Sequence, residues 1–403
     1  MVKILLAITF ICPLFVFAQP NTWLKKNDFG GGKRERAVAF SIGNYGYIGT
    51  GIDTAEAVLK DLWQYDPTLD TWTQKADLPG EARRDAIGFS LGNKGYIGTG
   101  INNNASFLGN KLADFYEYDP LSNSWTQKAN FPGNGGFGIY FATAFTVDSK
   151  GYVCGGKNGP NTYSNQLWEY KPSIDQWTSR ANFPGGPRYQ LASFSIGNFG
   201  YVGLGANQDI FKKDFWKYNP GNNQWTQVAD LIASERGGAA TFTIGERGFV
   251  CTGTNGGTQK DLIEYNPVSN SWALRSYYGG SDRKNAVAFV VNGKAYLGTG
   301  KGGNKKSSMY EYTPHNFLSV DENEQLDLTI YPNPTADFIV VESSSNLIEE
   351  VVIYSINGLE IYREKMFNTN HKIDLTTALP GVYVVQLIGV GGNQLDSKQI
   401  IVQ

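Results

Sequence analysis

Apolar and polar positions alternate in six pairs of short runs between residues 37 and 300. A short turn carrying Gly, Asn or Asp joins the two runs of each pair. The six pairs occupy residues 37–51, 86–100, 142–156, 191–205, 239–253 and 286–300. Alternation with a period of two predicts a β-strand, and two such runs across a tight turn predict an antiparallel hairpin. The sequence therefore predicts six hairpins.

A second pattern follows each hairpin and ends in tryptophan. It places Tyr seven residues before Trp, and it occurs at residues 61–72, 114–125, 166–177, 214–225 and 261–272. A sixth copy begins at residue 308, but Ser319 stands where Trp is expected. Each copy adds two strands, so a unit has four strands and repeats about every fifty residues. This period predicts a β-propeller with one sheet per unit.

Trp23 stands near the N-terminus without the rest of this pattern. Phe29 follows it by six residues, as Leu78 follows Trp72. We therefore expect the residues around Trp23 to supply the fourth strand that the unit ending at Ser319 lacks. Such an exchange leaves no open strand edge for pairing with other chains.

The repeated residues resemble kelch repeats over residues 20–318. An Arg precedes the first strand, a Tyr and a Gly-rich pair close the second, Asp and Tyr occupy the third, and Trp occupies the fourth. The resemblance implies an all-β fold, in which residues 19–318 form a six-bladed propeller closed by an N-terminal strand.

The composition changes after residue 318. Residues 319–325 are polar and acidic and are expected to form a linker, while residues 326–403 alternate again and predict a small antiparallel β-sandwich. Its motifs are Tyr331-Pro332-Asn333-Pro334, the hairpin at 355–362, Leu379-Pro380-Gly381-Val382-Tyr383, and an apolar end after Lys398.

These motifs resemble the type A C-terminal sorting domain of the type IX secretion system. The resemblance implies that the secretion machinery is a partner of this domain. It also implies passage across the outer membrane, followed by removal of the domain and either release or surface attachment. An ordinary accessory sandwich is the alternative.

The first eighteen residues predict a secretory signal. Lys3 precedes an apolar stretch that ends at Ala18 and is short for a membrane span, with small residues before the expected cut. A lipoprotein anchor at Cys12 is the alternative. Signal and sorting domain together predict a protein that passes through the periplasm to the medium or the outer cell surface. No transmembrane segment is expected in the mature chain.

Charge and histidine content narrow the function. A net charge of −2 without a run of Lys or Arg argues against nucleic-acid binding. The two histidines, His315 and His371, cannot form a His-based triad or a multi-histidine metal site inside the propeller. The copper-radical galactose oxidases, a kelch-type family, need two His and a Tyr crosslinked to Cys, so their activity is not expected. We expect no metal or other cofactor and assign no catalytic residue.

Cys154 and Cys251 occupy equivalent positions in units three and five. One interpretation is a disulfide, which an oxidising compartment allows; the other is a pair of small buried residues in strands too far apart to be bridged. A recurring carboxylate also has two interpretations, a structural hydrogen-bonding role or a catalytic cluster. It is found at Asp61, Asp114, Asp214 and Asp261, with Gln166 and Ser308 in the other units.

The candidate ligand-binding residues precede the first strands. Five units carry Arg there and unit three carries Ile139; the arginines are Arg34, Arg83, Arg188, Arg236 and Arg283. First strands surround the propeller axis, so we expect these guanidinium groups to converge at one mouth of the channel, where they suit carboxylate, sulfate or phosphate groups. Unit three adds Phe137, Tyr140 and Phe141, which suit stacking against a sugar. A purely structural role for the arginines, as part of the kelch pattern, is the alternative.

Two functions remain open. The first is binding of an acidic glycan or acidic peptide at the mouth, aided by the individual loops 53–60, 102–113, 158–165 and 207–213 with Phe107, Tyr163 and Phe211. The second is a secreted sugar epimerase or lyase that uses Arg and a carboxylate, for which Glu235 and Asp282 are the candidates.

Overall fold

The computed structural model describes residues 21–102, 110–314, 328–343, 348–356, 359–365, 370–389 and 394–403. The expected signal at residues 1–18 with Cys12, the expected linker at 319–325 and Phe107 lie outside the described residues. The chain divides into two compact units, Met1–Phe317 and Leu318–Gln403. Each unit is described by itself below.

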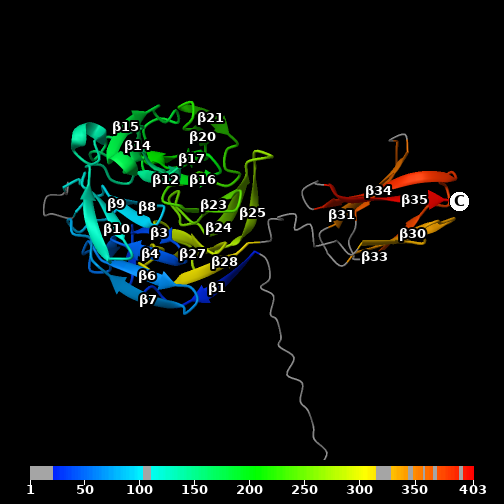
Figure 1. The fold of residues 1–403 in the computed structure, drawn as a ribbon, viewed down its shortest axis with the longest axis horizontal. Coiled ribbons are helices and arrows are strands. Elements are labelled where there is room, and N and C mark those ends of the chain that lie inside the picture. Colours follow the sequence, from blue (N-terminus) through cyan, green and yellow to red (C-terminus); the bar gives the residue numbers. More distant parts are fainter. Residues whose placement is uncertain are drawn as a thin grey trace, which may run out of the picture. The chain divides into compact units, whose positions relative to one another are not determined.

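Four-stranded antiparallel sheets make up the first unit (Figure 1). The first sheet contains β3 (Val38–Ile42), β4 (Tyr45–Gly49), β6 (Leu62–Asp66) and β7 (Thr71–Lys75). The second contains β8 (Ile87–Leu91), β9 (Lys94–Gly98), β10 (Phe115–Asp119) and β11 (Ser124–Lys128). The third contains β12 (Thr143–Val147), β13 (Lys150–Cys154), β14 (Leu167–Lys171) and β15 (Gln176–Arg180).

Three further sheets complete the set of six. The fourth contains β16 (Ala192–Ile196), β17 (Phe199–Gly203), β20 (Phe215–Asn219) and β21 (Gln224–Val228). The fifth contains β22 (Ala240–Ile244), β23 (Arg247–Cys251), β24 (Asp261–Asn266) and β25 (Ser271–Tyr277). The sixth contains β26 (Val287–Val291), β27 (Lys294–Gly298), β28 (Met309–Thr313) and the N-terminal strand β1 (Thr22–Lys26). The all-β propeller predicted from the sequence is thus observed.

The sixth sheet takes its outer strand from the N-terminus. Strand β1 pairs antiparallel with β28, and Trp23 lies opposite Tyr312. The two rings are 5.0 Å apart, and the Trp23 indole N–H donates a hydrogen bond to Ser276 at 3.1 Å. This pairing occupies the edge of β28, which would otherwise expose a row of unpaired backbone groups.

The inner strands contact one another around the axis, and β26 contacts β3. Aromatic rings fill the space between successive sheets. Phe40 stacks on Tyr47 of its own sheet with ring centroids 5.5 Å apart, and Phe289 of the sixth sheet lies over Gly46. A Cβ atom at Gly46 would come within 2.0 Å of the Phe289 ring, so only glycine fits there.

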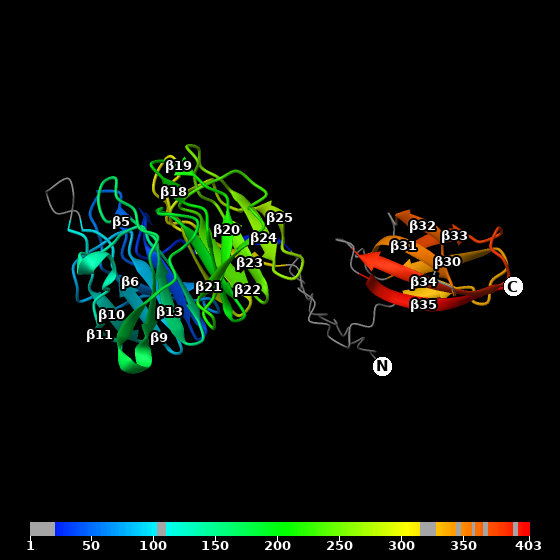
Figure 2. The ribbon, with the colours of Figure 1, turned by 90° about the horizontal axis from the view of Figure 1, so that it is seen from above.

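Two short two-stranded ribbons lie at the end of the propeller where the first strand of each sheet begins. They are the ribbon of β2 (Arg34–Glu35) with β5 (Ile52–Asp53) and the ribbon of β18 (Ala206–Asn207) with β19 (Ile210–Phe211). Figure 2 shows β5 and β18–β19 at the same end of the propeller. Two short 3-10 turns occur at Gly133–Gly136 and Pro172–Ile174. Within the described ranges, no helix is long and apolar enough to cross a membrane.

The disulfide considered for Cys154 and Cys251 is wrong. Both thiols are free and fully buried, one on β13 and one on β23, and burial raises the pKa of each thiol. The two cysteines are therefore small core residues of the third and fifth sheets, because their equivalent strands belong to sheets that are not neighbours in the ring.

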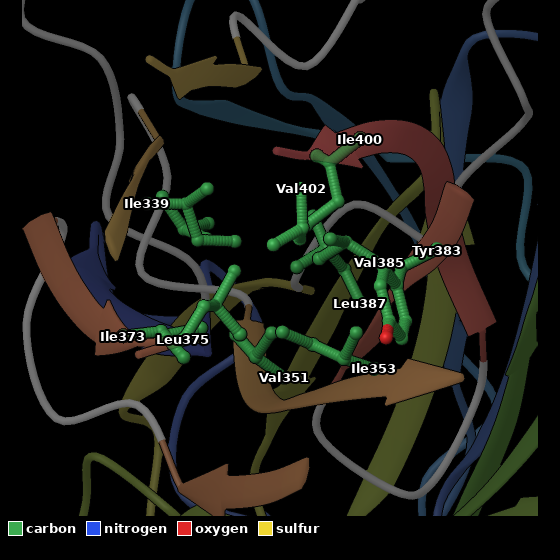
Figure 3. Close-up of a cluster of buried hydrophobic side chains, with 11 residues drawn as sticks. Ile339, Val351, Ile353, Ile373, Leu375, Tyr383, Val385, Leu387, Ile400 and Val402 are labelled. Atoms are coloured by element: carbon green, nitrogen blue, oxygen red, sulfur yellow. The ribbon is translucent and has the colours of Figure 1, made fainter. Parts of the chain in front are cut away.

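The second unit consists of two antiparallel sheets. One contains β29 (Leu328–Tyr331), β30 (Phe338–Ser343) and β33 (Asn370–Asp374); the other contains β32 (Glu360–Lys365), β31 (Ile348–Ser355), β34 (Gly381–Gly389) and β35 (Gln394–Val402). Apolar side chains from both sheets meet in one core, in which Ile339, Val351 and Val385 are fully buried (Figure 3). Residues 357–358, in the middle of the hairpin expected at 355–362, lie outside the described residues.

Asn333 connects the beginning of the second unit to its end. Its side-chain amide donates to the carbonyl of Gln399 at 3.0 Å and accepts from the amide of Ile401 at 2.9 Å. Tyr383 plays a similar local role, since its hydroxyl donates to the carbonyl of Leu379 at 2.7 Å. Both motifs found in the sequence thus have a structural function, which is to hold strands and turns of this unit together.

Candidate ligand site at the channel mouth

Six residues in the left-handed backbone region precede the six inner strands. Each residue stands two positions after the recurring Arg of its unit, or after Ile139 in unit three. The backbone angle φ lies between 53° and 60° in all six. They are Arg36, Asp85, Phe141, Gln190, Gly238 and Asn285. A positive φ is uncommon for residues other than glycine, most of all for a bulky residue such as Phe141. Residues held in this way cluster at ligand clamps and active sites.

A cycle of six backbone hydrogen bonds holds these residues in place. The amide of each residue donates to the carbonyl of the corresponding residue in the preceding unit, so the amide of Asp85 donates to the carbonyl of Arg36. The amide of Arg36 donates to the carbonyl of Asn285 and closes the cycle. The six distances are 2.8–3.2 Å. We call these residues the mouth ring. The cycle compensates for the unfavourable backbone conformation, because each member gains one donor and one acceptor bond.

The side chains of the mouth ring differ from unit to unit. Arg36 lies 3.4 Å from Asp85 and 3.6 Å from Glu35, and its guanidinium group lies over the Phe141 ring at 5.0 Å. Its Nε atom is buried and has no hydrogen-bond partner. The Arg36 side chain is 27% exposed, so it presents accessible positive charge at the mouth.

Two acidic residues lie beneath this arginine. The side chain of Asp85 is only 1% exposed and pairs with Arg36 and Arg84. Burial raises the pKa of Asp85, although both arginines act in the opposite direction. Glu35 is buried as well and accepts a hydrogen bond from Asn285 at 2.9 Å.

Aromatic rings line the side of the mouth that belongs to units three and four. Tyr140 and Phe141 are 5.6 Å apart, Phe141 and Tyr189 are 5.8 Å apart, and Tyr163 stacks on Tyr189 at 5.4 Å. The ammonium group of Lys157 lies over the rings of Tyr189 and Tyr163 at 4.5 and 5.3 Å. Burial lowers the pKa of Lys157. We call these four rings the aromatic wall.

The five arginines proposed from the sequence occupy buried positions in their own units. Their exposed fractions are 0–3%. Arg34, Arg83, Arg188 and Arg236 each form a two-pronged ion pair with the recurring Asp of the same unit, at 2.5–3.2 Å. Each also donates to the carbonyl that follows the second strand, at 2.8–3.1 Å. The exposed positive charge at the mouth therefore comes from other residues, and ligand contact by these five stays a prediction.

The recurring aspartates are explained by the same contacts. Asp61 and Asp214 accept from an arginine and also from the indole N–H of Trp63 and Trp216, at 2.8 and 2.9 Å. In the sixth unit Ser308 takes the position of Asp, and its hydroxyl accepts from Arg283 at 3.0 Å. The structural interpretation of these carboxylates thus agrees with their geometry.

The remaining candidates lie in different places. Tyr140 belongs to the aromatic wall, whereas Phe137 is 75% exposed and lines a surface pocket with Asn134 and Asn158. Glu235 and Asp282 are exposed, and neither belongs to the mouth ring. Asp282 instead accepts from the hydroxyl of Thr258 and lines a separate pocket at the fifth sheet.

Sequence reasoning missed Glu35, Arg36, Asp85 and Arg84. A signal for Arg36 and Asp85 exists in the repeats, because the position two residues after the recurring Arg carries a different residue in every unit. Tyr163, which the sequence placed on an individual loop, does reach the mouth through Tyr189.

Comparison with known proteins agrees with this architecture. The family described as "Secretion system C-terminal sorting domain" matches residues 329–403, and the family described as "Kelch motif" matches residues 139–184. No curated protein matches the sequence. The solved structure entitled "Structure of YjhT" is similar with a TM-score of 0.61 and 17% sequence identity over 70% of this chain and 95% of that chain, a level that shows the fold alone. The chain therefore has a β-propeller fold that contains a Kelch motif, and it carries a type IX secretion C-terminal sorting domain, which indicates export to the cell surface or the medium.

Proposed function

We propose that the exported propeller binds an acidic ligand, an acidic glycan or an acidic peptide, at the mouth ring. Arg36 and Arg84 supply the partly exposed guanidinium groups, whose planar forks suit carboxylate, sulfate and phosphate. Tyr140 and the rest of the aromatic wall supply faces on which a sugar or an aromatic side chain stacks. The five buried arginines enter this proposal as supports that fix the loops in front of the first strands.

The observation that carries the proposal is the stabilised negative charge of the Glu56 carboxylate. This side chain is 70% exposed on the loop after β5, and Lys305 donates to it at 2.6 Å. The hydrogen bond from Lys305, and then the positive charges of Lys305, Lys301 and Arg36, lower the pKa of Glu56. An exposed carboxylate at this mouth is thus stabilised in its charged form, as the acid group of a ligand would be.

The test is binding of acidic and neutral glycans and peptides to the full mature chain. Arg36→Gln should weaken binding of the acidic ligand about tenfold or more, and binding should fall as salt rises. Lys94→Gln is the matched control, because Lys94 lies at the opposite end of the second sheet. Equal binding by Arg36→Gln and the natural chain, with both folded, would contradict the proposal.

A sugar epimerase or lyase is the second candidate. It would depend on Asp85, the buried carboxylate whose pKa is raised and which lies between Arg36 and Arg84. A carboxyl group of raised pKa next to arginines suits proton transfer at a sugar carbon near a bound acid group. Turnover of the bound glycan that Asp85→Asn abolishes, while binding persists, would favour this candidate over simple binding.

A further inference from the structure

The fifth sheet lacks a side chain that the other sheets possess. Two residues after the recurring Asp, on the third strand, the other five units carry a large aromatic residue. These residues are Trp63, Tyr116, Trp168, Trp216 and Tyr310. The fifth unit carries Ile263 at this position, on β24.

The aromatic ring covers the loop that enters its own unit. Trp63, Trp168 and Trp216 lie edge-on to Phe29, Phe131 and Phe183 of that loop, at 6.2–6.5 Å. Glycine lies under the ring: a Cβ atom at Gly80 would come within 2.9 Å of Tyr116, and one at Gly280 within 2.9 Å of Tyr310. The fifth unit carries Ala233 where the other units carry this glycine, which agrees with the loss of the ring.

The indole of this residue also makes a specific hydrogen bond. Its N–H donates to the residue two positions earlier, at 2.8 Å in unit one, 3.1 Å in unit three and 2.9 Å in unit four. In unit five that acceptor is Asp261, which is paired with Arg236. Ile263 has no N–H to donate, so the carboxylate retains acceptor capacity that the indole uses in the other units.

A pocket of about 540 Å³ occupies this place in the fifth unit. The volume lies within the range of about 300–1,000 Å³ that is usual for small-molecule sites. Ile232, Leu274 and Tyr277 form its apolar walls, the fully buried Ile263 lies behind them, and Asp261 lines the pocket as well. The pocket therefore offers an apolar slot together with a carboxylate acceptor.

The neighbouring strand β25 is adapted to the same pocket. Leu274 lies opposite Ile263, whereas the residues in register with the aromatic ring of units one to four are polar: Gln74, Gln127, Ser179 and Gln227. Ile232, Leu274 and Tyr277 are 61%, 51% and 60% exposed, so three large apolar side chains meet solvent around one opening. Scattered apolar residues are ordinary on a surface, but a cluster around a pocket marks a binding site.

We propose that this pocket binds an indole ring, the side chain of a tryptophan that a partner peptide presents. The incoming ring takes the place of the aromatic residue that the fifth unit lacks. Its face packs on Ile232 and Leu274 above the fully buried Ile263, and its N–H donates to the carboxylate of Asp261. This site belongs to the outer part of the fifth sheet and does not depend on the function proposed for the mouth ring.

The test uses N-acetyl-L-tryptophanamide as the probe and the full mature chain, with binding followed by calorimetry or NMR. The probe should bind at one site, and its N1-methylated form should bind about tenfold more weakly because it has lost the donor. Ile263→Trp should abolish binding, since the chain then fills the pocket itself. Val268→Trp, a change at an exposed turn of the same sheet, is the control and should bind as the natural chain does.

A converse variant makes the test independent of Ile263. Trp216→Ile combined with Gln227→Leu reproduces the pair Ile263 and Leu274 next to Asp214 in the fourth unit, so the folded double variant should bind two probe molecules instead of one. Undiminished binding by Ile263→Trp or equal affinity for the N1-methylated probe would overturn the proposal. Absence of binding to the natural chain at millimolar probe, or a single site in the folded double variant, would overturn it as well.

Discussion

The amide of Arg36 donates a hydrogen bond to the carbonyl of Asn285 at 3.2 Å, which joins the first unit of the propeller to the sixth. The same two units share a sheet edge, because the strand that contains Trp23 pairs with β28. Hydrogen bonds at the mouth and strand exchange at the rim thus connect the beginning of the propeller to its end at two separate places.

Trp23→Ala should destabilise the propeller. This side chain packs against Tyr278 and Tyr312 at ring distances of 5.0 Å, and it is partly buried. We expect the free energy of unfolding to fall by about 2–4 kcal/mol, somewhat less than for a fully buried tryptophan. Leu24→Ala, a change in the same strand at a 59% exposed residue, should cost less than about 0.5 kcal/mol. Equal melting temperatures for the two variants would contradict the role assigned to this strand.

A buried arginine that pairs with a carboxylate should contribute more to the stability of the propeller than one that pairs with a hydroxyl. Arg83→Ala leaves Asp114 without its ion-pair partner, and we expect a loss of about 2–4 kcal/mol in the free energy of unfolding. Arg283→Ala should cost less, because its partner at this position is the hydroxyl of Ser308. Denaturant unfolding of both variants measures the difference. Weaker ligand binding by Arg83→Ala with unchanged stability would instead assign this arginine to the ligand.

Glu169 should make the stability of the propeller depend on pH. Its carboxylate accepts from Arg180 at 2.8 and 3.0 Å and from Tyr152 at 2.8 Å. Burial acts to raise the pKa of Glu169, but these hydrogen bonds outweigh it and the pKa is lowered. A folded-state pKa below the unfolded value means that the unfolded chain binds more protons, so this contribution is present above the unfolded pKa and is lost as pH falls through the folded pKa.

Glu169→Gln is therefore expected to reduce the free energy of unfolding by about 2 kcal/mol at pH 7. The difference from the natural chain should shrink as pH falls from about 5 to about 3. Thermal unfolding across this pH range provides the measurement, and a difference that does not change with pH would show that the carboxylate is not the origin of the effect.

The sorting domain should depend on Asn333 for its stability. Asn333→Ala removes two hydrogen bonds to β35, so we expect a loss of about 1–3 kcal/mol in the unfolding of this unit and less protein at the cell surface. Leu379→Ala is the control, because that side chain is 77% exposed.

A chain that ends at Val320 lacks the whole second unit, and we expect its propeller to fold but to remain in the periplasm. Normal surface delivery of that shortened chain would show that the second unit is not needed for export.

The repeat pattern predicted the six hairpins, the four strands of each unit and the exchange of the strand around Trp23. These features depend on local alternation and on residues that recur, such as Tyr65 and Trp72, which pair in the structure as they do in the pattern. The pairing of Arg34 with Asp61 was not predicted. Both residues recur, but the sequence does not show whether the guanidinium group of Arg34 pairs with the carboxylate of its own unit or points into the channel.

The sequence by itself determined the six units of the propeller and the four main strands of each, because side-chain alternation and turn chemistry act over a few residues. Only the tertiary structure decided which residues form the site. Arg36, Asp85 and Phe141 become neighbours because successive units of about fifty residues place the same short loop around one axis. The pocket beside Asp261 is likewise formed by residues from separate segments, with Ile232 on a loop, Asp261 on β24 and Leu274 on β25. Contacts between distant segments are set by the packing of whole sheets, and no local pattern contains them.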